Sequence, residues 1–125
     1  MAGVVKEEMA RFCRGKRVFV TGHTGFKGTW LCKLLLHLGA EVAGYALPSP
    51  TEEGGRLFKN VLEGKIRSVQ GDVRDKAALQ KAMTDFSPEI VLHLAAQPIV
   101  LESYKKPVLT YETNVMGTVN VLECV

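Results

Sequence analysis

RVFVTGHTGFKG, residues 17–28, joins a strand-like run to three evenly spaced glycines. The run Arg17–Thr21 is short and rich in branched side chains, which is typical of a buried strand. Gly22, Gly25 and Gly28 follow it, and a helical pattern begins after them. At such a turn a phosphate can approach the backbone, where free N–H groups and the helix dipole attract it. We therefore expect this turn to bind a phosphate group.

The glycine spacing Gly-x-x-Gly-x-x-Gly is a variant of the general dinucleotide fingerprint Gly-x-Gly-x-x-Gly. Lys27, between the second and third glycines, would add a full positive charge beside a pyrophosphate. A purely structural turn is the alternative. The strand-turn-helix setting favours phosphate binding over it.

Strand and helix patterns alternate along the rest of the chain. Three further runs predict strands, at Glu41–Leu47, Ile66–Val69 and Ile90–Ala95. Two apolar helix faces are predicted between strands, one formed by Trp30, Leu31, Leu34, Leu35 and Leu38, the other by Ala78, Leu79, Ala82, Met83 and Phe86 after an N-cap at Asp75. This alternation predicts an α/β fold: a Rossmann-type doubly wound parallel sheet, in part, with about four strands and flanking helices.

Two segments depart from this alternation. Pro48–Gly64 has the proline, glycine and charge content of a surface excursion, with one short helical turn expected around Leu57–Leu62. The last helix is expected to begin near Pro107 and is apolar on more than one face, which predicts burial on more than one side. Because no capping residue precedes its end at Val125, we expect the natural polypeptide to continue.

Composition excludes several classes of protein. The 125 residues suffice for one domain at most, and a net charge of +3 is small. The basic residues near the amino end are expected to be solvated and not to bind nucleic acid; they are Arg11, Arg14, Lys16 and Arg17. Three widely spaced cysteines and no metal-ligand spacing favour a reduced protein without zinc. No signal peptide or membrane span is evident, so we expect a cytoplasmic protein that binds no membrane.

The remaining candidate ligand contacts follow the later strands. The second strand ends near Tyr45–Leu47 without the acid that often binds the adenosine ribose, so the residues leave NAD and NADP open. In the loop Gly71–Asp75, Asp72 can accept a hydrogen bond from an adenine amine or serve as a turn residue. Small residues in His93–Pro98 suit a flat ligand, while His93 itself is expected to be packed inside the strand.

Four motifs, in this order and spacing, resemble the extended short-chain dehydrogenase/reductase family: GHTGFKG (22–28), GDVRD (71–75), HLAAQP (93–98) and TNVMGT (113–118). Within it the chain is most similar to the nucleotide-sugar 4,6-dehydratases that act on CDP-glucose, whose phosphate loop also carries His-Thr and Phe-Lys. The resemblance implies a lead-in over residues 1–15 and, over residues 16–125, the amino-terminal part of an NAD(P)-binding Rossmann domain, with the substrate domain absent.

The resemblance also implies which residues contact the cofactor, which it favours as NAD. The pyrophosphate turn would be Gly22, Gly25 and Gly28, with Thr24, Phe26 and Lys27 beside it; Asp72 and Val73 would flank the adenine; Leu94, Ala95, Ala96 and Gln97 would line the nicotinamide ribose, and Thr113 would contact the cofactor. Asn114 would tie helix to strand. Such lyases take a hydride from C4 of the sugar, eliminate water across C5 and C6, and return the hydride to C6.

The family's catalytic Tyr-x-x-x-Lys pair is missing from this chain, because Tyr45, Tyr104 and Tyr111 are not followed by lysine four residues on. We therefore expect no catalytic residue here and no dehydration by this chain alone. Part of an NAD-dependent epimerase or reductase, or of a GDP-mannose dehydratase, is an open alternative, as is a standalone dinucleotide-binding module without catalysis. Family members pair through the last helix, so we expect a homo-oligomer.

Overall fold

The alternating patterns produce a parallel sheet of four strands, β1 (Arg17–Thr21), β2 (Glu41–Ala46), β3 (Arg67–Gln70) and β4 (Ile90–His93). The computed structural model describes residues 2–125; Met1, the first residue of the predicted lead-in, lies outside them. The strand order is β3-β2-β1-β4, so the chain crosses from one edge of the sheet to the other after β3. The α/β, Rossmann-type prediction is confirmed.

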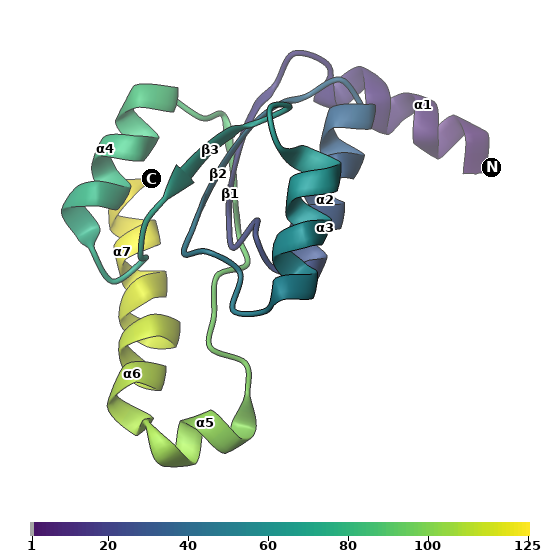
Figure 1. Cartoon of the computed structure of the whole chain (residues 1–125). Coiled ribbons are helices and arrows are strands. Elements are labelled where there is room, and N and C mark those ends of the chain that lie inside the picture. Colours follow the sequence, from purple (N-terminus) through teal and green to yellow (C-terminus); the bar gives the residue numbers. More distant parts are fainter. Residues whose placement is uncertain (1) are drawn as a thin grey trace.

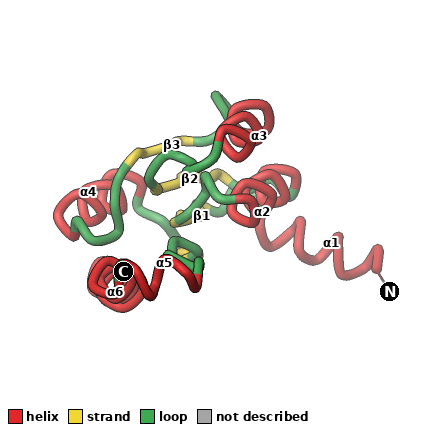
Figure 2. Tube along the Cα trace, turned by 60° about the horizontal axis from the view of Figure 1, so that its bottom comes forward, coloured by secondary structure: helices red, strands yellow, loops and turns green. Residues whose placement is uncertain are grey.

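Helices cover both faces of this sheet (Figures 1 and 2). One face carries α2 (Phe26–His37) and α3 (Glu52–Leu62), and the other carries α4 (Lys76–Phe86) and α7 (Gly117–Cys124). α1 (Ala2–Cys13) extends away from the sheet. The short helices α5 (Val100–Lys105) and α6 (Pro107–Tyr111) lead through a π-helical segment, η1 (Glu112–Met116), into α7.

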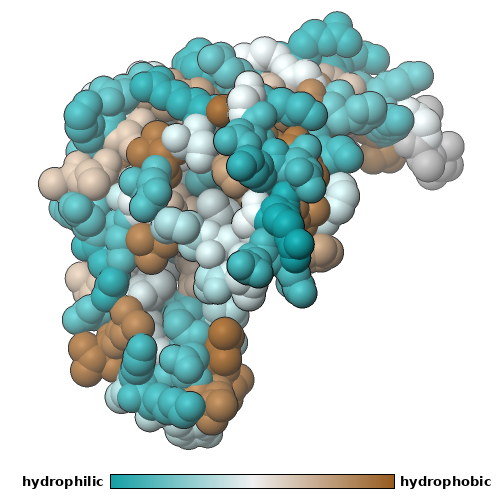
Figure 3. Space-filling view, in the orientation of Figure 1, coloured by the Kyte–Doolittle hydropathy of each residue, from teal (hydrophilic) through white to brown (hydrophobic). Residues whose placement is uncertain are grey.

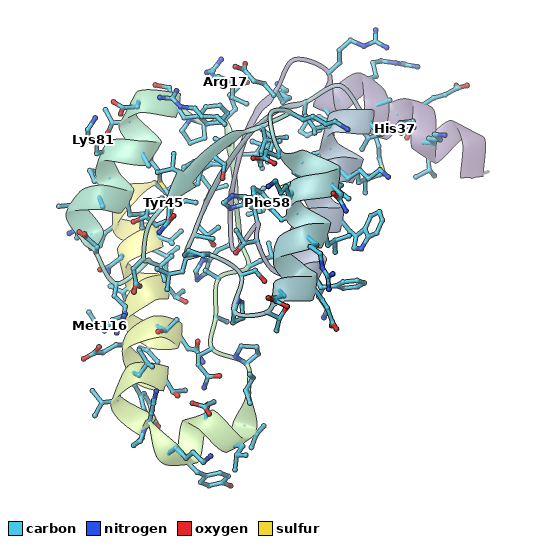
Figure 4. The ribbon with its side chains drawn as sticks, viewed as in Figure 1. Arg17, His37, Tyr45, Phe58, Lys81 and Met116 are labelled. Atoms are coloured by element: carbon cyan, nitrogen blue, oxygen red, sulfur yellow. The ribbon has the colours of Figure 1, made fainter. Side chains whose placement is uncertain are left out.

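The core consists of two apolar layers because successive residues of β1 point to opposite faces. Val18 and Val20 pack with α2 and α3, and Phe19 packs with α4 and α7. Tyr45 of β2 is fully buried on the α4 side, where its ring stacks with that of Phe19 at 6.2 Å (Figure 4). These layers hold β1 rigidly, and the glycine turn follows β1 directly.

The buried face of α2 differs from the predicted one. Trp30 and Leu34, expected in the core, are 42% and 47% exposed, whereas Cys32 is fully buried. The start of the helix sets its rotation, because Gly28 packs directly against the carbonyl group of Gly22. The predicted face of α4 is confirmed, as is its N-cap.

Two other segments contain more helix than predicted. Pro48–Gly64 includes the eleven-residue helix α3, whose N-cap Thr51 accepts a hydrogen bond from the Gly54 amide at 3.0 Å. The last helix begins at Pro107, as predicted, but buries only one face, formed by Gly117, Asn120 and Val121. In Figure 3 apolar residues gather over α5 and α6. Among the described residues, no helix is long and apolar enough to cross a membrane.

Candidate functional site

Two loops meet where the strand order reverses, between β1 and β4. Thr21 pairs with Tyr45 on one side and His93 on the other, so these strands end at the same edge of the sheet. The glycine turn and the loop after β4 touch there, since a Cβ atom on Gly22 would lie 2.7 Å from the backbone nitrogen of Ala95. Ligands of open α/β sheets bind at such a switch point.

The three glycines of the turn are required for different reasons. Gly22 has a φ of +80°, which disfavours other residues, and a Cβ atom on Gly28 would overlap the Gly22 carbonyl oxygen. Gly25 has an ordinary φ of −74°, and its Cβ atom would meet only the Gly22 oxygen, at 3.4 Å. Because Gly25 is exposed and only mildly restricted by the chain, its bare surface fits the close approach of a ligand.

The first turn of α2 leaves backbone donors free for an anion. Its N-cap, Gly25, offers no side chain, and no side-chain cap from the described residues takes its place. The helices α3 and α4, by contrast, are capped by Thr51 and Asp75. The amides of the first helical turn have no partner within a helix, and Lys27 is exposed beside them. These residues fit a bound pyrophosphate.

Two other predicted contacts of the turn have partners within the chain. The Thr24 hydroxyl donates to the Leu47 carbonyl oxygen at 2.7 Å, which ties the turn to the end of β2. The Phe26 side chain is 70% exposed and meets Trp30 edge to face, with 6.4 Å between ring centroids. Both residues lie at the turn, and the side chain of each contacts another part of the chain.

His23, inside the turn, packs into the core. Its ring leaves no room for a Cβ atom on Gly44, and its Nε2 atom lies 2.7 Å from Ser68 Oγ. Phe58 points from α3 toward the sheet and meets the ring edge to face at 5.3 Å (Figure 4). The Nδ1 atom is buried without a partner among the described residues. Burial lowers the pKa of His23 to about 4, so the imidazole is neutral near pH 7.

The predicted adenine contacts lie in the loop after β3. Asp72 accepts hydrogen bonds from Arg74, and this contact holds the pKa of the Asp72 carboxyl below its usual value. Val73 is buried, and its carbonyl oxygen accepts a hydrogen bond from Asn120 Nδ2 at 2.9 Å. The Tyr45 hydroxyl donates to the backbone oxygen of Asp72 at 2.9 Å. The loop is therefore fixed to β2 and α7.

The loop after β4 is held by Thr21. The amides of Leu94 and Ala95 both donate to the Thr21 hydroxyl oxygen at 3.1 Å. Ala96 is exposed. Gln97 donates its backbone N–H to Asn114 Oδ1 at 2.7 Å and accepts at its carbonyl from Asn114 Nδ2 at 3.0 Å. Asn114 therefore ties η1 to the loop after β4, whereas the prediction had it tie the helix to the strand itself.

His93 of β4 belongs to a chain of hydrogen bonds that connects α7 with β1. Thr118 donates to the Asn114 carbonyl oxygen at 2.7 Å, so it accepts from His93 Nε2 at 3.1 Å. His93 Nδ1 is then an acceptor and takes the proton of the Thr21 hydroxyl at 2.6 Å. Burial lowers the pKa of His93, which keeps this neutral tautomer. His93 is packed and fully hydrogen-bonded, as predicted.

Several residues at the site were not predicted, namely Thr21, Arg74 and Thr118. All three are polar side chains whose hydrogen-bond partners lie 2 to 72 positions away, and a strand-end threonine alone gives no signal. Thr113 lies half-buried in η1. A π-helical segment is common at functional sites.

The second strand ends without a carboxylate, as predicted. Leu47, directly after β2, is 51% exposed, while Glu52 and Glu53 lie in the first turn of α3.

Two cavities lie away from the glycine turn. One, of about 430 Å³, is lined by the amino ends of β2 and β3, and the other, of about 550 Å³, lies between α4, α7 and β4.

The comparisons with known proteins agree with this geometry. The GDP-mannose 4,6-dehydratase family model matches residues 19–125. A CDP-glucose 4,6-dehydratase of Salmonella typhimurium is 55% identical over 115 residues, which are 91% of this chain and 32% of the relative. A GDP-mannose 4,6-dehydratase of Sordaria araneosa is 36% identical over 110 residues, 88% of this chain and 20% of the relative.

Solved structures show the same fold. An epimerase of Methanothermobacter thermautotrophicus superposes with a TM-score of 0.83 at 30% identity, over 96% of this chain and 34% of that one. A UDP-glucose 4-epimerase of Thermus thermophilus, solved with NAD, gives a TM-score of 0.75 at 36% identity, over 86% of this chain and 33% of that one. The chain thus spans about a third or less of the length of these relatives.

Proposed function

Because the chain belongs to the GDP-mannose 4,6-dehydratase family, we propose that it is the NAD-binding part of a nucleotide-sugar 4,6-dehydratase that acts on CDP-glucose. Residues 16–125 would form the amino-terminal part of the cofactor domain, after a lead-in over residues 1–15. The 55% identity with a CDP-glucose 4,6-dehydratase supports this choice of sugar nucleotide. The solved neighbours that contain NAD support the choice of cofactor.

One observation carries the proposal. The glycine turn leaves an uncapped helix start, an exposed Gly25 and the exposed Lys27 at the edge of the sheet where β1 and β4 end. A structural turn would need Gly22 and Gly28, which pack against the chain, but it would gain nothing from a bare Gly25 or an uncapped helix. A pyrophosphate uses both features.

Each group of residues has a defined task in this proposal. The turn, with Gly22, Gly25, Gly28, Thr24, Phe26 and Lys27 around it, would hold the pyrophosphate. Asp72 and Val73 would hold the adenine, because their loop is fixed at the same edge of the sheet. Leu94, Ala95, Ala96 and Gln97 would line the nicotinamide ribose, and Thr113 would contact the cofactor. The cofactor, when bound, would supply reversible hydride transfer.

The chain itself is proposed to bind the cofactor without catalysing dehydration. None of its three tyrosines is followed by lysine four positions on, so the proton-transfer pair is missing from it. We expect no 4-keto sugar when the purified chain is incubated with NAD and CDP-glucose. Formation of that product would contradict this part of the proposal.

Titration with NAD, NADP and ADP tests the binding function, with the fluorescence of Trp30 as the signal. Trp30 is the only tryptophan, lies one turn after the start of α2 and is 42% exposed. We expect saturable quenching with NAD and weaker binding of NADP. No response to any of the three, repeated by calorimetry, would overturn the proposed function.

An NAD-dependent epimerase is the second candidate, because the solved neighbours include several UDP-glucose 4-epimerases. The cofactor-binding residues would have the same tasks in both enzymes. The two candidates differ in substrate, so the product formed by a chain that includes the catalytic pair separates them. A binding module without catalysis is favoured if no such chain exists.

We also propose that the chain pairs with a second copy of itself and that it is located in the cytoplasm. The outer face of η1 and α7 exposes Val115, Val119 and Leu122, which are 49%, 41% and 70% accessible and suit pairing with a second copy. The free thiols of Cys13, Cys32 and Cys124 support a reducing compartment such as the cytoplasm.

A further inference from the structure

The loop after β3 contains a carboxylate that is held by one arginine through three contacts. Asp72 Oδ1 accepts the backbone N–H of Arg74 at 2.9 Å. Asp72 Oδ2 accepts Arg74 Nε at 2.9 Å and Nη2 at 2.6 Å. The Asp72 side chain is 20% exposed and that of Arg74 is 37% exposed, so both lie at the surface of the loop. The arginine fixes both the position and the rotation of the carboxylate.

These contacts leave Asp72 with little free hydrogen-bonding capacity. An ionised carboxylate accepts about four hydrogen bonds and donates none. Three positions are filled by Arg74, two of them on Oδ2 and one on Oδ1. One acceptor position therefore remains, on Oδ1. The Asp72 carboxyl is ionised at neutral pH, and the hydrogen bonds from Arg74 lower its pKa further, so this position is an acceptor.

A second contact holds the arginine itself. Arg74 Nη1 lies 3.4 Å from Glu112 Oε2 at the start of η1. The guanidinium thus spans the adenine loop and the segment that carries Thr113. Because its three nitrogens all have partners, Arg74 cannot swing away without giving up several charge-assisted hydrogen bonds.

Building on the proposed function, we propose that Arg74 is a positioning residue that makes the site select adenine over hypoxanthine. Adenine presents an amine at the position where hypoxanthine presents a carbonyl oxygen. The Asp72 carboxylate, a fixed acceptor with one free position, accepts a hydrogen bond from the adenine amine and repels the carbonyl oxygen of hypoxanthine. Without Arg74 the carboxylate could turn or hydrogen-bond to water, and the two bases would be bound more equally.

The test compares NAD with nicotinamide hypoxanthine dinucleotide, by calorimetry on the full chain. The affinity ratio of the two ligands is measured for the unaltered chain, Arg74→Gln, Arg74→Lys and the control Arg67→Gln. Arg67 lies exposed on β3 and makes no side-chain hydrogen bond with the described residues. Melting curves check that each variant is folded.

We expect the unaltered chain to prefer NAD and Arg74→Gln to reduce this preference about tenfold, the effect of losing charge-assisted hydrogen bonds. Arg74→Lys should restore part of the preference, since lysine keeps the charge without the fork, and Arg67→Gln should keep all of it. If NAD binds, but folded Arg74→Gln or Arg74→Lys keeps the full affinity ratio of the two dinucleotides, the proposed role of Arg74 is contradicted. If neither dinucleotide binds the unaltered chain, the proposed function fails as well.

Discussion

Gly28 lets the first turn of α2 pack directly against the backbone that follows β1, because a Cβ atom at this position would overlap the Gly22 carbonyl oxygen. In Gly28→Ala the new methyl group would overlap that oxygen, and the backbone on both sides would have to move. We expect this variant to lose about 2–4 kcal/mol of unfolding free energy, in urea denaturation, as for other overpacked sites. It should also bind NAD more weakly.

Gly55→Ala is the matched control for this variant. Gly55 lies in α3, and a Cβ atom there meets nothing within 4 Å. Alanine should stabilise the helix by about 0.5–1 kcal/mol. Equal effects of the two substitutions would contradict the packing described for the turn.

Buried His23 and half-buried His93 predict how stability depends on pH. Burial lowers the pKa of His23 to about 4 and lowers that of His93, while an unfolded histidine titrates near 6.5. The unfolded chain therefore binds more protons as the pH falls below 6.5, and stability decreases from there down to about pH 4. For His23 the loss is on the order of 3 kcal/mol.

Urea denaturation at pH 7.5, 5.5 and 4.5 measures this loss. His23→Gln should flatten much of the slope, whereas His37→Gln, on the exposed side of α2, should leave it unchanged. The acids with lowered pKa values, such as Asp72 and Glu89, add further losses from about pH 5 downward, as they become protonated in the unfolded chain. A stability that is constant from pH 7.5 to 4.5 would contradict the burial of the His23 imidazole.

Among the helices, α4 depends on its N-cap. Asp75 Oδ1 accepts the amide of Ala78 at 3.1 Å. Asp75→Ala should lower the unfolding free energy by about 1 kcal/mol. Asp85→Ala is the control: this residue has an exposed contact with Lys81 at 2.8 Å, so its loss should lower the stability clearly less than the loss of Asp75. Thermal melts compare the stability of the two variants, and equal losses for both would contradict a stabilising N-cap at Asp75.

The helices also explain why sequence patterns predicted some elements and missed others. The face of α4 followed its apolar spacing, because only the sheet and α7 pack on it. The rotation of α2 depends on the contact between Gly28 and Gly22, which apolar spacing does not reveal. Gly54 and Gly55 gave α3 the composition of a loop, although Thr51 and two glutamates begin a helix there.

Across the whole molecule, the positions of the site loops could be predicted and their internal contacts could not. Parallel strands bring their carboxyl ends to one edge, so the motifs after β1, β3 and β4 were expected to meet. The partners of Arg74 and His93 come from segments far along the chain, Glu112 and Thr118, and only the fold brings them together. The role of each predicted contact residue remains a prediction.

The exposed apolar face of the last helices makes a prediction for the assembly. Val119 and Leu122 are exposed although they are large and apolar. We expect light scattering at micromolar concentration to give a mass above that of one 13.7 kDa chain. Val119→Lys with Leu122→Lys should return it to a monomer, because the charges would be desolvated in the contact. A monomeric unaltered chain would contradict the prediction.

A dinucleotide is proposed to bind at the glycine turn, at the carboxyl ends of β1 and β4. Amide chemical shifts of the isotope-labelled chain, followed during titration with NAD, locate the site directly. We expect saturable shifts at Gly25, Phe26, Lys27 and Gly28, together with Asp72 and Ala96, and none in the cavity at the amino ends of β2 and β3. Shifts confined to that cavity, or no shifts at the turn, would contradict it.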